Sequence, residues 1–418
     1  MNVLVLGSGG REHAICKSIK ESKSLKKLWC FPGNAGTNEL CNKERLSNLN
    51  FESILNFCIK KKVDLVIPGS EEYLEKGITD YLNLEGIRVL GPTQAAAQLE
   101  SSKIFTKKIC KIANIKTAKW KLYKNASKAI KDIKFQNFPL VLKMDSLAAG
   151  KGVFIANNIK EAVTFLSNIN KGLIGEKNSK ILQEEVLYGE EASFFFIVDG
   201  TNAKYLGSAK DYKRVGEKNT GLNTGGMGCI SPSPLDNKKT INKVLKEIIT
   251  PTLKCMKKNG YPYKGILYAG LMFTKRGIYL IEYNVRLGDP ECQSILSRLK
   301  TDFLKICNSI VNEKIHKLDI ALDKKFSLCV VIASKGYPEK YKKNISLKIL
   351  KELKLEPNFR VYHAGTKLDK NNKLISDGGR VLGLVVKKKN IKEAVTCLYE
   401  KIETVEWKNL FYRNDIGS

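Results

Sequence analysis

Short apolar runs alternate with amphipathic stretches over the first hundred residues. Val3–Leu6 is apolar throughout and is followed by glycine, which predicts a strand buried on both faces. Arg11–Lys20 then carries its apolar residues at helical spacing. This alternation predicts a parallel sheet with helices on both faces, which binds ligands at the carboxyl ends of its strands. The further elements predicted here are strands at Leu28–Phe31, Val63–Pro68 and Val89–Leu90 and a helix at Phe51–Lys60.

The pattern changes near residue 102, where Ser101-Ser102 can cap a new helix and apolar strands begin to follow one another directly. Two helices interrupt the strands: Lys238–Asn259, with a break expected at Pro251, and Asp302–Asn312. We therefore predict a second domain over 103–315, with a small subdomain at about 120–190. Its predicted strands are Lys119–Tyr123, Leu140–Lys143, Val153–Ala156, Ile181–Val186, Phe194–Val198, Ile266–Thr274 and Ile278–Tyr283.

A third, smaller domain is predicted over 326–418, after a linker at Asn312–Lys325. At 418 residues the chain is long enough for several cores. The fold class expected is therefore a multidomain mixture of α/β and α+β. The elements predicted in the last domain are strands at Phe326–Ala333, Val361–Gly365 and Arg380–Val386 and a helix at Ile391–Ile402.

One long segment, Lys210–Met227, is rich in glycine and polar residues and predicts a loop. It begins with Asp211, Lys213 and Arg214. Loops longer than about 12–15 residues inside a compact domain are usually functional or disordered. We interpret this one as a lid over a substrate, and a mobile surface loop is the alternative.

The formal net charge of +30 suggests a nucleic-acid partner, but the residue types argue against one. The chain has 62 lysines and only 10 arginines, spread along its whole length. Arginine is the residue that forks onto phosphates and bases, so a nucleic-acid-binding face would contain more of it. We expect no nucleic-acid partner.

Cysteine usage and hydropathy indicate the compartment. The 11 cysteines are scattered singly, without C-x-x-C pairs or Cys/His clusters, which disfavours a zinc site or a disulfide framework. The first residues lack the pattern of a signal peptide. No uncharged apolar run reaches the roughly 18 residues that cross a bilayer. We expect a cytoplasmic protein without membrane contact.

The strongest chemical signal lies in Ile281–Gln293, which reads IEYNVRLGDPECQ and follows an apolar strand. Residues two apart in a strand share a face, so Glu282 and Asn284 present two oxygens side by side. A carboxylate and an amide carbonyl are suitable ligands for Mg²⁺ that bridges nucleotide phosphates. Arg286 shares this face if the strand extends so far, and the Gly-Asp-Pro turn brings further polar side chains nearby. The alternative is an edge strand with solvated polar residues, but the crowding of polar side chains favours the metal site.

Two glycine-containing turns are candidates for phosphate binding. Gly7–Gly10 lies between a strand and a helix, where its amides and Arg11 can bind a phosphate. A dinucleotide is disfavoured, because Glu12 stands where G-x-G-x-x-G requires its third glycine. The second turn has Lys143 at its start and Lys151 between two glycines, and can fold over a triphosphate. A plain turn and a hairpin with two solvated lysines remain the alternatives.

Eight segments spread over the chain carry a resemblance to a known family. They read VLGSGGREH (5–13), PGNAGT (32–37), LAAGKG (147–152), GEEAS (189–193), NTGGMG (223–228), RLGDPECQ (286–293), HAGT (363–366) and YRNDIG (412–417). With these segments the sequence resembles the phosphoribosylamine–glycine ligases, enzymes of purine biosynthesis. The resemblance implies a Rossmann-like domain at 1–102, an ATP-grasp domain at 103–315 with a lid subdomain, and a C-terminal α+β domain.

The same resemblance implies a reaction and its site. ATP would convert the glycine carboxylate to glycyl phosphate, and the amine of 5-phosphoribosylamine would attack it. Glu282 and Asn284 would bind Mg²⁺ or Mn²⁺, and Arg286, Asp211 and Asp289 would be catalytic, with Arg286 facing the substrate carboxylate or phosphoryl group. The ATP-binding residues implied are Lys103, Lys143, Lys151, Glu184, Glu185, Val186, Leu187 and Glu191. The substrate-binding residues implied are Gly9, Gly10, Arg11, Asn34, Gly36, Thr37, Glu71, Asn223, Thr224, Gly225 and Glu291.

The sequence departs from the family pattern at four places. Ser146 stands where the family usually has Gly, Asn219 where it has an acid, and Leu222 where it has Pro. The loop at 68–73 also differs. One alternative follows from these departures: a different carboxylate–amine ligase whose altered loops at 68–73 and 217–222 take other substrates. The net charge of +30 alone motivates a second alternative, a basic binding protein without catalysis. For the ligase we expect a monomer that acts on small molecules.

Overall fold

The computed structural model describes the chain except for residues 45, 47, 147–151, 201, 352 and 354–355. The N-terminal region is a parallel sheet, as predicted, with the strand order β2-β1-β3-β4. Ser102 caps the helix that leaves this region, because its hydroxyl accepts the Phe105 N–H. The elements are β1 (Asn2–Gly7), α1 (Gly10–Lys20), β2 (Lys27–Pro32), α2 (Ala35–Leu40), α3 (Phe51–Lys61), β3 (Leu65–Pro68), α4 (Glu71–Glu75), α5 (Ile78–Leu84), β4 (Arg88–Val89), α6 (Gln94–Ser101) and α7 (Lys103–Ile112).

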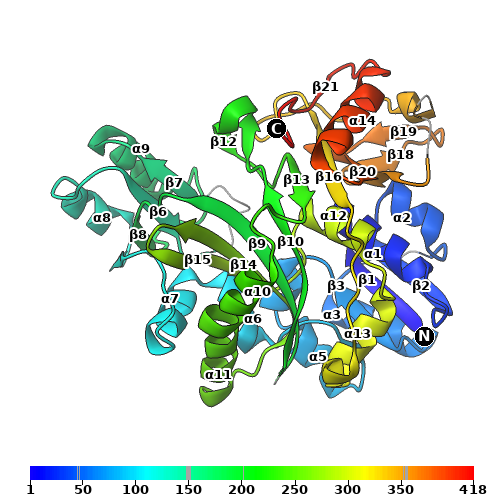
Figure 1. The fold of residues 1–418 in the computed structure, drawn as a ribbon, viewed down its shortest axis with the longest axis horizontal. Helices are drawn as coiled ribbons and strands as arrows, with labels where there is room; N and C mark the ends of the chain where they lie inside the picture. The colour runs from blue at the N-terminus through cyan, green and yellow to red at the C-terminus, as the bar shows by residue number, and fades with distance from the viewer. Residues whose placement is uncertain (45, 47, 147–151, 201, 352, 354–355) are drawn as a thin grey trace.

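A small antiparallel sheet projects from the body of the molecule, at the left of Figure 1. Its strand order is β5-β8-β6-β7, and two helices pack on it around a separate core that includes Leu142, Ala129 and Ile169. We refer to this unit, residues 120–185, as the lid sheet. Its elements are β5 (Trp120–Tyr123), α8 (Ala126–Ile133), β6 (Leu140–Met144), β7 (Val153–Ala156), α9 (Ile159–Asn170) and β8 (Ile181–Glu185).

The central sheet is a long antiparallel array with the order β15-β14-β9-β10-β13-β16-β20-β17. The run FFFIV is apolar at every position because β9 is covered on both faces: Phe194 and Phe196 enter one core, Phe195 and Ile197 the other. The C-terminal strands extend this sheet, since β16 pairs with β13. The strands are β9 (Glu190–Asp199), β10 (Ala203–Asp211), β13 (Gly228–Ser231), β14 (Lys264–Thr274), β15 (Gly277–Asn284), β16 (Phe326–Ser334), β17 (Phe359–His363), β20 (Arg380–Lys388) and β21 (Leu410–Phe411), which pairs with β16.

Two sequence-based expectations need correction. The predicted loop at 210–227 is a small hairpin, because β10 runs to Asp211 and two short strands follow. The helix predicted to break at Pro251 continues, because a π-helical turn precedes it and proline is tolerated in a first helical turn. The remaining elements are β11 (Arg214–Gly216), η1 (Glu217–Asn219), β12 (Thr220–Asn223), α10 (Lys238–Val244), η2 (Leu245–Ile249), α11 (Thr250–Lys258), α12 (Glu291–Arg298), α13 (Phe303–Val311), η3 (Ile315–Lys317), η4 (Lys348–Lys351), β18 (Thr366–Leu368), β19 (Leu374–Ser376) and α14 (Ile391–Glu403).

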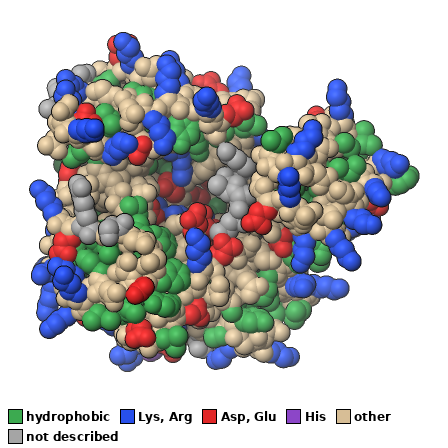
Figure 2. Space-filling view, turned by 180° about the vertical axis from the view of Figure 1, so that it is seen from behind, with side chains coloured by type: hydrophobic (Ala, Val, Ile, Leu, Met, Phe, Trp, Pro, Cys, Tyr) green, Lys and Arg blue, Asp and Glu red, His purple; other side chains and the backbone are tan. Residues whose placement is uncertain are grey.

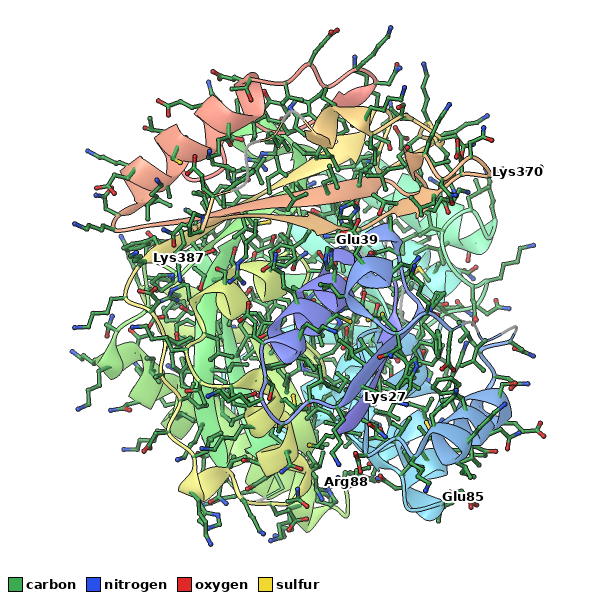
Figure 3. All side chains as sticks on the ribbon, turned by 90° about the vertical axis from the view of Figure 1, so that its right-hand side faces the viewer. Lys27, Glu39, Glu85, Arg88, Lys370 and Lys387 are labelled. Atoms are coloured by element: carbon green, nitrogen blue, oxygen red, sulfur yellow. The ribbon has the colours of Figure 1, made fainter. Side chains whose placement is uncertain are left out.

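The N-terminal and C-terminal regions lie against each other, although they are far apart in sequence. Helix α2, which carries Glu39, contacts β17 and β18 (Figure 3). At this contact the His363 N–H donates to His13 Nδ1 over 2.8 Å. Burial lowers the pKa of His13 to about 3 and that of His363 to about 4, so both rings are neutral at pH 7. Every helix within the described residues is too short or too polar to span a bilayer.

Candidate active site

Glu282 and Asn284 lie on the edge strand of the central sheet, as the two-residue spacing predicts. Glu282 stands opposite Gly270 of β14 and Asn284 opposite Tyr268. A Cβ at Gly270 would come within 3.2 Å of Glu282 Cγ, so the glycine gives the carboxylate its space. The Asn284 side chain makes no hydrogen bond with the described residues. Two adjacent oxygen donors of this kind fit Mg²⁺, which completes its shell with phosphate and water.

The ammonium of Lys213 stands between two carboxylates of this site. Lys213 Nζ contacts Glu191 of β9 at ion-pair distance and lies 3.9 Å from Glu282 Oε1. Burial acts to raise the pKa of Glu282, but Lys213, Lys143 and Lys103 outweigh it and the pKa is lowered. The Glu282 carboxylate is therefore charged at pH 7, as a metal ligand must be.

Three lysines from α7 and β6 line the side of the site toward the lid sheet. Lys143 and Lys107 form ion pairs with the two oxygens of Glu184, at 2.9 Å and 3.0 Å. Lys103 donates to the Ser146 carbonyl over 3.0 Å, and burial lowers the pKa of Lys103. Two of the three cations thus share one buried carboxylate, and Lys103 has only a carbonyl as its hydrogen-bond partner among the described residues. The excess positive charge favours a polyanion such as a triphosphate.

The segment after β8 leads from the lid sheet to the central sheet. Glu185 accepts the Lys119 N–H over 3.0 Å, and Val186 and Leu187 are half-buried. Glu191, four residues further on, exposes 40% of its side chain. Lys151 lies outside the described residues. Lys107 was not predicted from the sequence, although its spacing of four from Lys103 places both on one helix face.

The glycine-rich turn after β1 encloses a buried carboxylate. Glu12 is 2% exposed and accepts the Gly9 N–H and, at 2.7 Å, Arg11 Nε. A Cβ at Gly69, after β3, would come within 2.0 Å of Glu12 Oε1. Glu12, which disfavoured a dinucleotide in the sequence, therefore explains why glycines surround it: they make room for its side chain. The Arg11 backbone and side chain face the Leu287–Asp289 turn, at 3.2 Å from Asp289 Oδ2 and 3.0 Å from the Leu287 carbonyl.

Asn34, Gly36 and Thr37 are buried beneath this turn. The Asn34 amide donates to the carbonyls of Ser8, Gly9 and His363 over 2.8 Å, 3.2 Å and 2.9 Å. Its oxygen accepts the Thr37 N–H. A Cβ at Gly36 would lie 2.3 Å from the His13 ring. These residues shape the turn, and their substrate contact, which the resemblance implied, stays a prediction.

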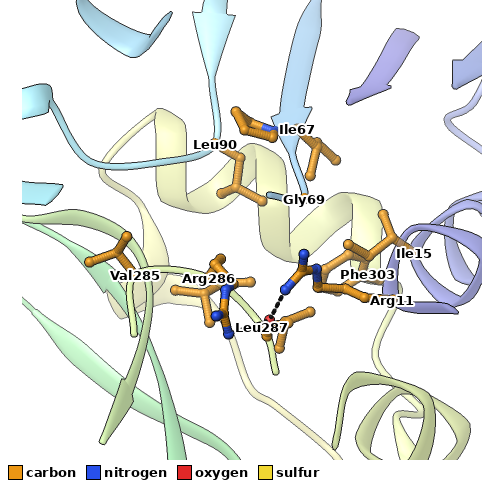
Figure 4. Close-up of a pocket in the computed structure, with 11 residues that line it drawn as sticks. Arg11, Ile15, Ile67, Gly69, Leu90, Val285, Arg286, Leu287 and Phe303 are labelled. Atoms are coloured by element: carbon orange, nitrogen blue, oxygen red, sulfur yellow. Dashed lines mark hydrogen bonds between the residues drawn. The ribbon is translucent and has the colours of Figure 1, made fainter. Parts of the chain in front are cut away.

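The guanidinium of Arg286 is held by two carboxylates from the N-terminal region. Its Nε lies 3.1 Å from Glu71 Oε2 and its Nη2 lies 2.7 Å from Glu100 Oε1. Arg286 and Arg11 point into one small pocket below Gly69, where Arg11 donates to the Leu287 carbonyl (Figure 4). Arg286 is thus ion-paired with two carboxylates, and its expected position facing the substrate carboxylate or phosphoryl group stays a prediction. Sequence reasoning missed Glu100, because nothing in α6 marks it apart from its charge.

Glu100 gives a pH-dependent prediction. Burial raises the pKa of Glu100 to about 7 from its usual 4.5, although Arg286 opposes the shift. The folded protein therefore binds this proton more tightly than the unfolded chain. The stabilising contribution is complete below pH 4.5 and is lost as the pH rises through about 7. We expect Glu100→Gln to flatten this fall in unfolding free energy, by up to ~3 kcal/mol. Urea denaturation at a series of pH values measures the unfolding free energy. If that free energy falls with pH in Glu100→Gln as it does in the wild type, Glu100 is not the group responsible.

The turn at 288–291 contacts the segment 223–226, which follows the hairpin of β11 and β12. Arg380 of β20 donates to the Gly225 carbonyl and to the Asp289 carbonyl, both over 2.6 Å. Thr224 is buried and donates to the Lys213 carbonyl over 2.7 Å. The predicted Asn223, Gly225 and Asp289 are thereby brought together. Arg380, which was not predicted, joins them, and only the pairing of β20 with β16 places it there.

Two acidic groups at this junction, Asp211 and Glu291, form no ion pair with the part of the chain that the structure describes. Asp211 Oδ1 is buried and has no hydrogen-bond partner among the described residues. Burial and the charge of Glu291 raise the pKa of Asp211, and burial also raises the pKa of Glu291. Acidic side chains gather around a hollow in the middle of the face shown in Figure 2, while lysines and arginines are scattered over its outer parts. The Asp211 carboxyl, whose pKa is raised by burial and by the charge of Glu291, is suited to accept a proton.

A lid sheet that faces a central antiparallel sheet across a row of lysines and a carboxylate–amide pair defines an ATP-grasp enzyme. The biotin carboxylase domain of a Hydrogenobacter thermophilus carboxylase, solved with MgADP and bicarbonate, has this fold. It matches with a TM-score of 0.72 at 19% identity, over 98% of this chain and 91% of its own.

Closer similarities identify the family. Models of the N domain, the ATP-grasp domain and the C domain of phosphoribosylglycinamide synthetase match residues 1–100, 101–292 and 327–418. A phosphoribosylamine–glycine ligase of Caldanaerobacter subterraneus is 42% identical over 419 residues, 100% of both chains. The solved phosphoribosylamine–glycine ligase of Thermotoga maritima has a TM-score of 0.85 at 32% identity and full coverage of both chains. The chain belongs to the phosphoribosylglycinamide synthetase family and is a ligase of purine biosynthesis that forms a C–N bond.

Proposed function

We propose that the chain joins glycine to 5-phosphoribosylamine at the expense of ATP, giving N1-(5-phosphoribosyl)glycinamide, ADP and phosphate. The observation that carries this proposal is the position of Glu282 and Asn284. They lie on an edge strand between the lysines of the lid side and the turn at 288–291. Family membership supports the choice of substrates.

The nucleotide is proposed to lie between the lid sheet and the central sheet. Lys103 and Lys143 would contact its phosphates, and Glu184 would orient Lys143 through their ion pair at 2.9 Å. The adenine would pack against the backbone of Glu185–Leu187, and Glu191 would accept the ribose hydroxyls. Lys151 is assigned to the phosphates by the resemblance alone.

The proposed chemistry needs positioning and charge neutralisation. A glycine carboxylate oxygen attacks the γ-phosphorus, the bond to ADP breaks, and glycyl phosphate forms. The amine nitrogen then attacks the carbonyl carbon, and phosphate leaves as the C–N bond forms. The nitrogen loses a proton, which Asp211 can accept because its Oδ1 is buried without a hydrogen bond from the described residues. Mg²⁺ or Mn²⁺ on Glu282 and Asn284 would supply neutralisation of the phosphate charge.

The substrates are proposed to lie between the turn after β1 and the segment 223–226. The amides of Gly9, Gly10 and Arg11 would face the sugar phosphate. Asn223, Thr224 and Gly225 would face the glycine side, with Glu291 and Asp289 below. Glu71 and Arg286 would act as an ion pair that shapes this wall, since each already binds the other at 3.1 Å.

The test measures ADP and product in a complete reaction mixture and in one that lacks phosphoribosylamine. With ATP, glycine and freshly made phosphoribosylamine we expect one ADP for each glycinamide ribonucleotide. Without the amine, ADP should not accumulate beyond one per enzyme. Equal ADP release without the amine, or product from another amino acid in preference to glycine, would overturn the proposal. We propose a monomer in the cytoplasm, and the cysteines scattered singly along the chain support a reducing compartment.

A further inference from the structure

The hairpin β11–β12, residues 214–223, is too small to fix its own position. It is a separate two-stranded sheet with the pairs Arg214–Asn223 and Gly216–Thr220, and residues 217–222 are exposed. Isolated two-stranded hairpins are marginal in water. Its two ends nevertheless continue into Lys213 and Thr224, which lie at the site. Whatever holds the hairpin therefore also places these residues.

Arg413, in the C-terminal segment, is the buried group that holds it. The side chain is 1% exposed. Its Nη1 donates to the Arg214 carbonyl over 2.9 Å and to Asn219 Oδ1 over 3.2 Å. Its Nε and Nη2 donate to the two oxygens of Asp415, each over 2.7 Å. The guanidinium carbon also lies 5.3 Å from the centre of the Tyr212 ring, at the end of β10. One side chain thus joins the start and the tip of the hairpin to the C-terminal segment.

The hairpin tip is held in an uncommon backbone conformation by the same segment. Lys218 and Asn219 have φ values of 51° and 57°, in the left-handed region that lysine rarely adopts. The Lys218 N–H donates to Asp415 Oδ2 over 2.7 Å, and Asn414 donates to Glu217 Oε1 over 2.9 Å. In Figure 1 the C-terminus lies beside β12. The tip therefore takes its shape from contacts with residues 413–415.

The hairpin passes its position on to the carboxylates of the site. The Thr224 N–H and hydroxyl both donate to the Lys213 carbonyl, over 2.8 Å and 2.7 Å, which joins the two ends of the hairpin. Lys213 Nζ in turn lies between Glu191 and Glu282. A shift of the hairpin would therefore move a cation relative to the proposed metal carboxylate.

We propose that Arg413 is a positioning residue for the ligation reaction: through Arg214, Asn219 and Asp415 it fixes the hairpin 214–223 and so sets Lys213 against Glu282. The inference rests on the proposed role of Glu282. The competing explanation is that Arg413 only stabilises the C-terminal region. The two explanations differ in what happens to turnover at equal stability.

The test compares Arg413→Met with Leu398→Ala, a variant in α14 whose side chain is fully buried in the same C-terminal core. Both should lower the unfolding midpoint. Only Arg413→Met should lower kcat, by about 10- to 100-fold, because small misplacements cost this much. The Kd of ADP, measured by calorimetry, should change by a smaller factor than kcat, since Lys103 and Lys143 are untouched. Amide exchange over 214–223 should accelerate in Arg413→Met alone.

Two further variants keep the proposal testable if Arg413→Met does not fold. Asn219→Ala should lower kcat severalfold at an unchanged unfolding midpoint, and Arg413→Lys should lie between wild type and Arg413→Met. The double variant Arg413→Met/Asn219→Ala should lose no more than Arg413→Met, because both changes break one contact. Unchanged kcat in Asn219→Ala, or an equal loss in Leu398→Ala, overturns the proposal. Absence of product from the wild type would instead overturn the proposed function.

Discussion

Replacement of Glu282 by Gln is expected to lower turnover by about 10³-fold, because it removes the one charged oxygen from the proposed metal pair. The side chain is 35% exposed, so its loss should change the unfolding free energy little. Lys213 would then face Glu191 alone. The rate of ADP formation at saturating substrates measures the effect, and the urea midpoint measures the fold.

Glu190→Gln is the matched control for this prediction. Glu190 is exposed at the start of β9, next in sequence to Glu191, and makes no ion pair with the described residues. It should retain wild-type turnover. Asn284→Ala should show an intermediate loss that added Mg²⁺ partly restores, since a weakened site fills by mass action. Near-normal turnover of Glu282→Gln would remove the metal assignment from this strand.

Arg286→Met is expected to lower the free energy of unfolding by ~3–5 kcal/mol, because it leaves the buried Glu100 and the partly exposed Glu71 without their shared cation. Burial acts to raise the pKa of Glu71, but Arg286 and Arg11 hold it at about 2. The Glu100 side chain is 7% exposed. Urea denaturation of the variant should show this loss at pH 8 and a smaller one at pH 5, where Glu100 takes up a proton and only the partly exposed Glu71 stays charged.

Two variants check the cause of that loss. Arg276→Met removes an exposed arginine near the start of β15 and should change the unfolding free energy by less than ~0.5 kcal/mol. The double variant Arg286→Met/Glu100→Gln should recover part of the stability, because the unpaired buried charge is gone. If the free energy of unfolding of Arg286→Met lies within ~1 kcal/mol of the wild-type value, the ion pairs of Arg286 contribute little to stability.

Local pattern was sufficient for most of the elements. The strand at 194–198 could be predicted because a fully apolar run needs cover on both faces, and β9 has it. Ser102 could be predicted as a cap because its hydroxyl acts within its own helix turn. The hairpin at 214–223 was missed, because its glycines and polar residues carry no strand pattern and its partner contacts come from residues 413–415.

The same distinction holds within the candidate site. Glu282 and Asn284 were found because strand geometry alone puts residues two apart on one face. Glu100, Arg380 and Arg413 were not found, because each contacts the site or the hairpin through residues that lie far away in the sequence, such as Arg286, Gly225 and Arg214.

The sequence by itself determined the βα alternation, the adjacent metal-type oxygens and the family, since these depend on neighbours within a few residues or on recurring segments. Only the tertiary structure decided that Arg286 binds two carboxylates, that glycines surround Glu12, and that the C-terminal segment holds the hairpin. The reason is physical: a buried charge requires a partner, but any segment brought close by the fold can supply it.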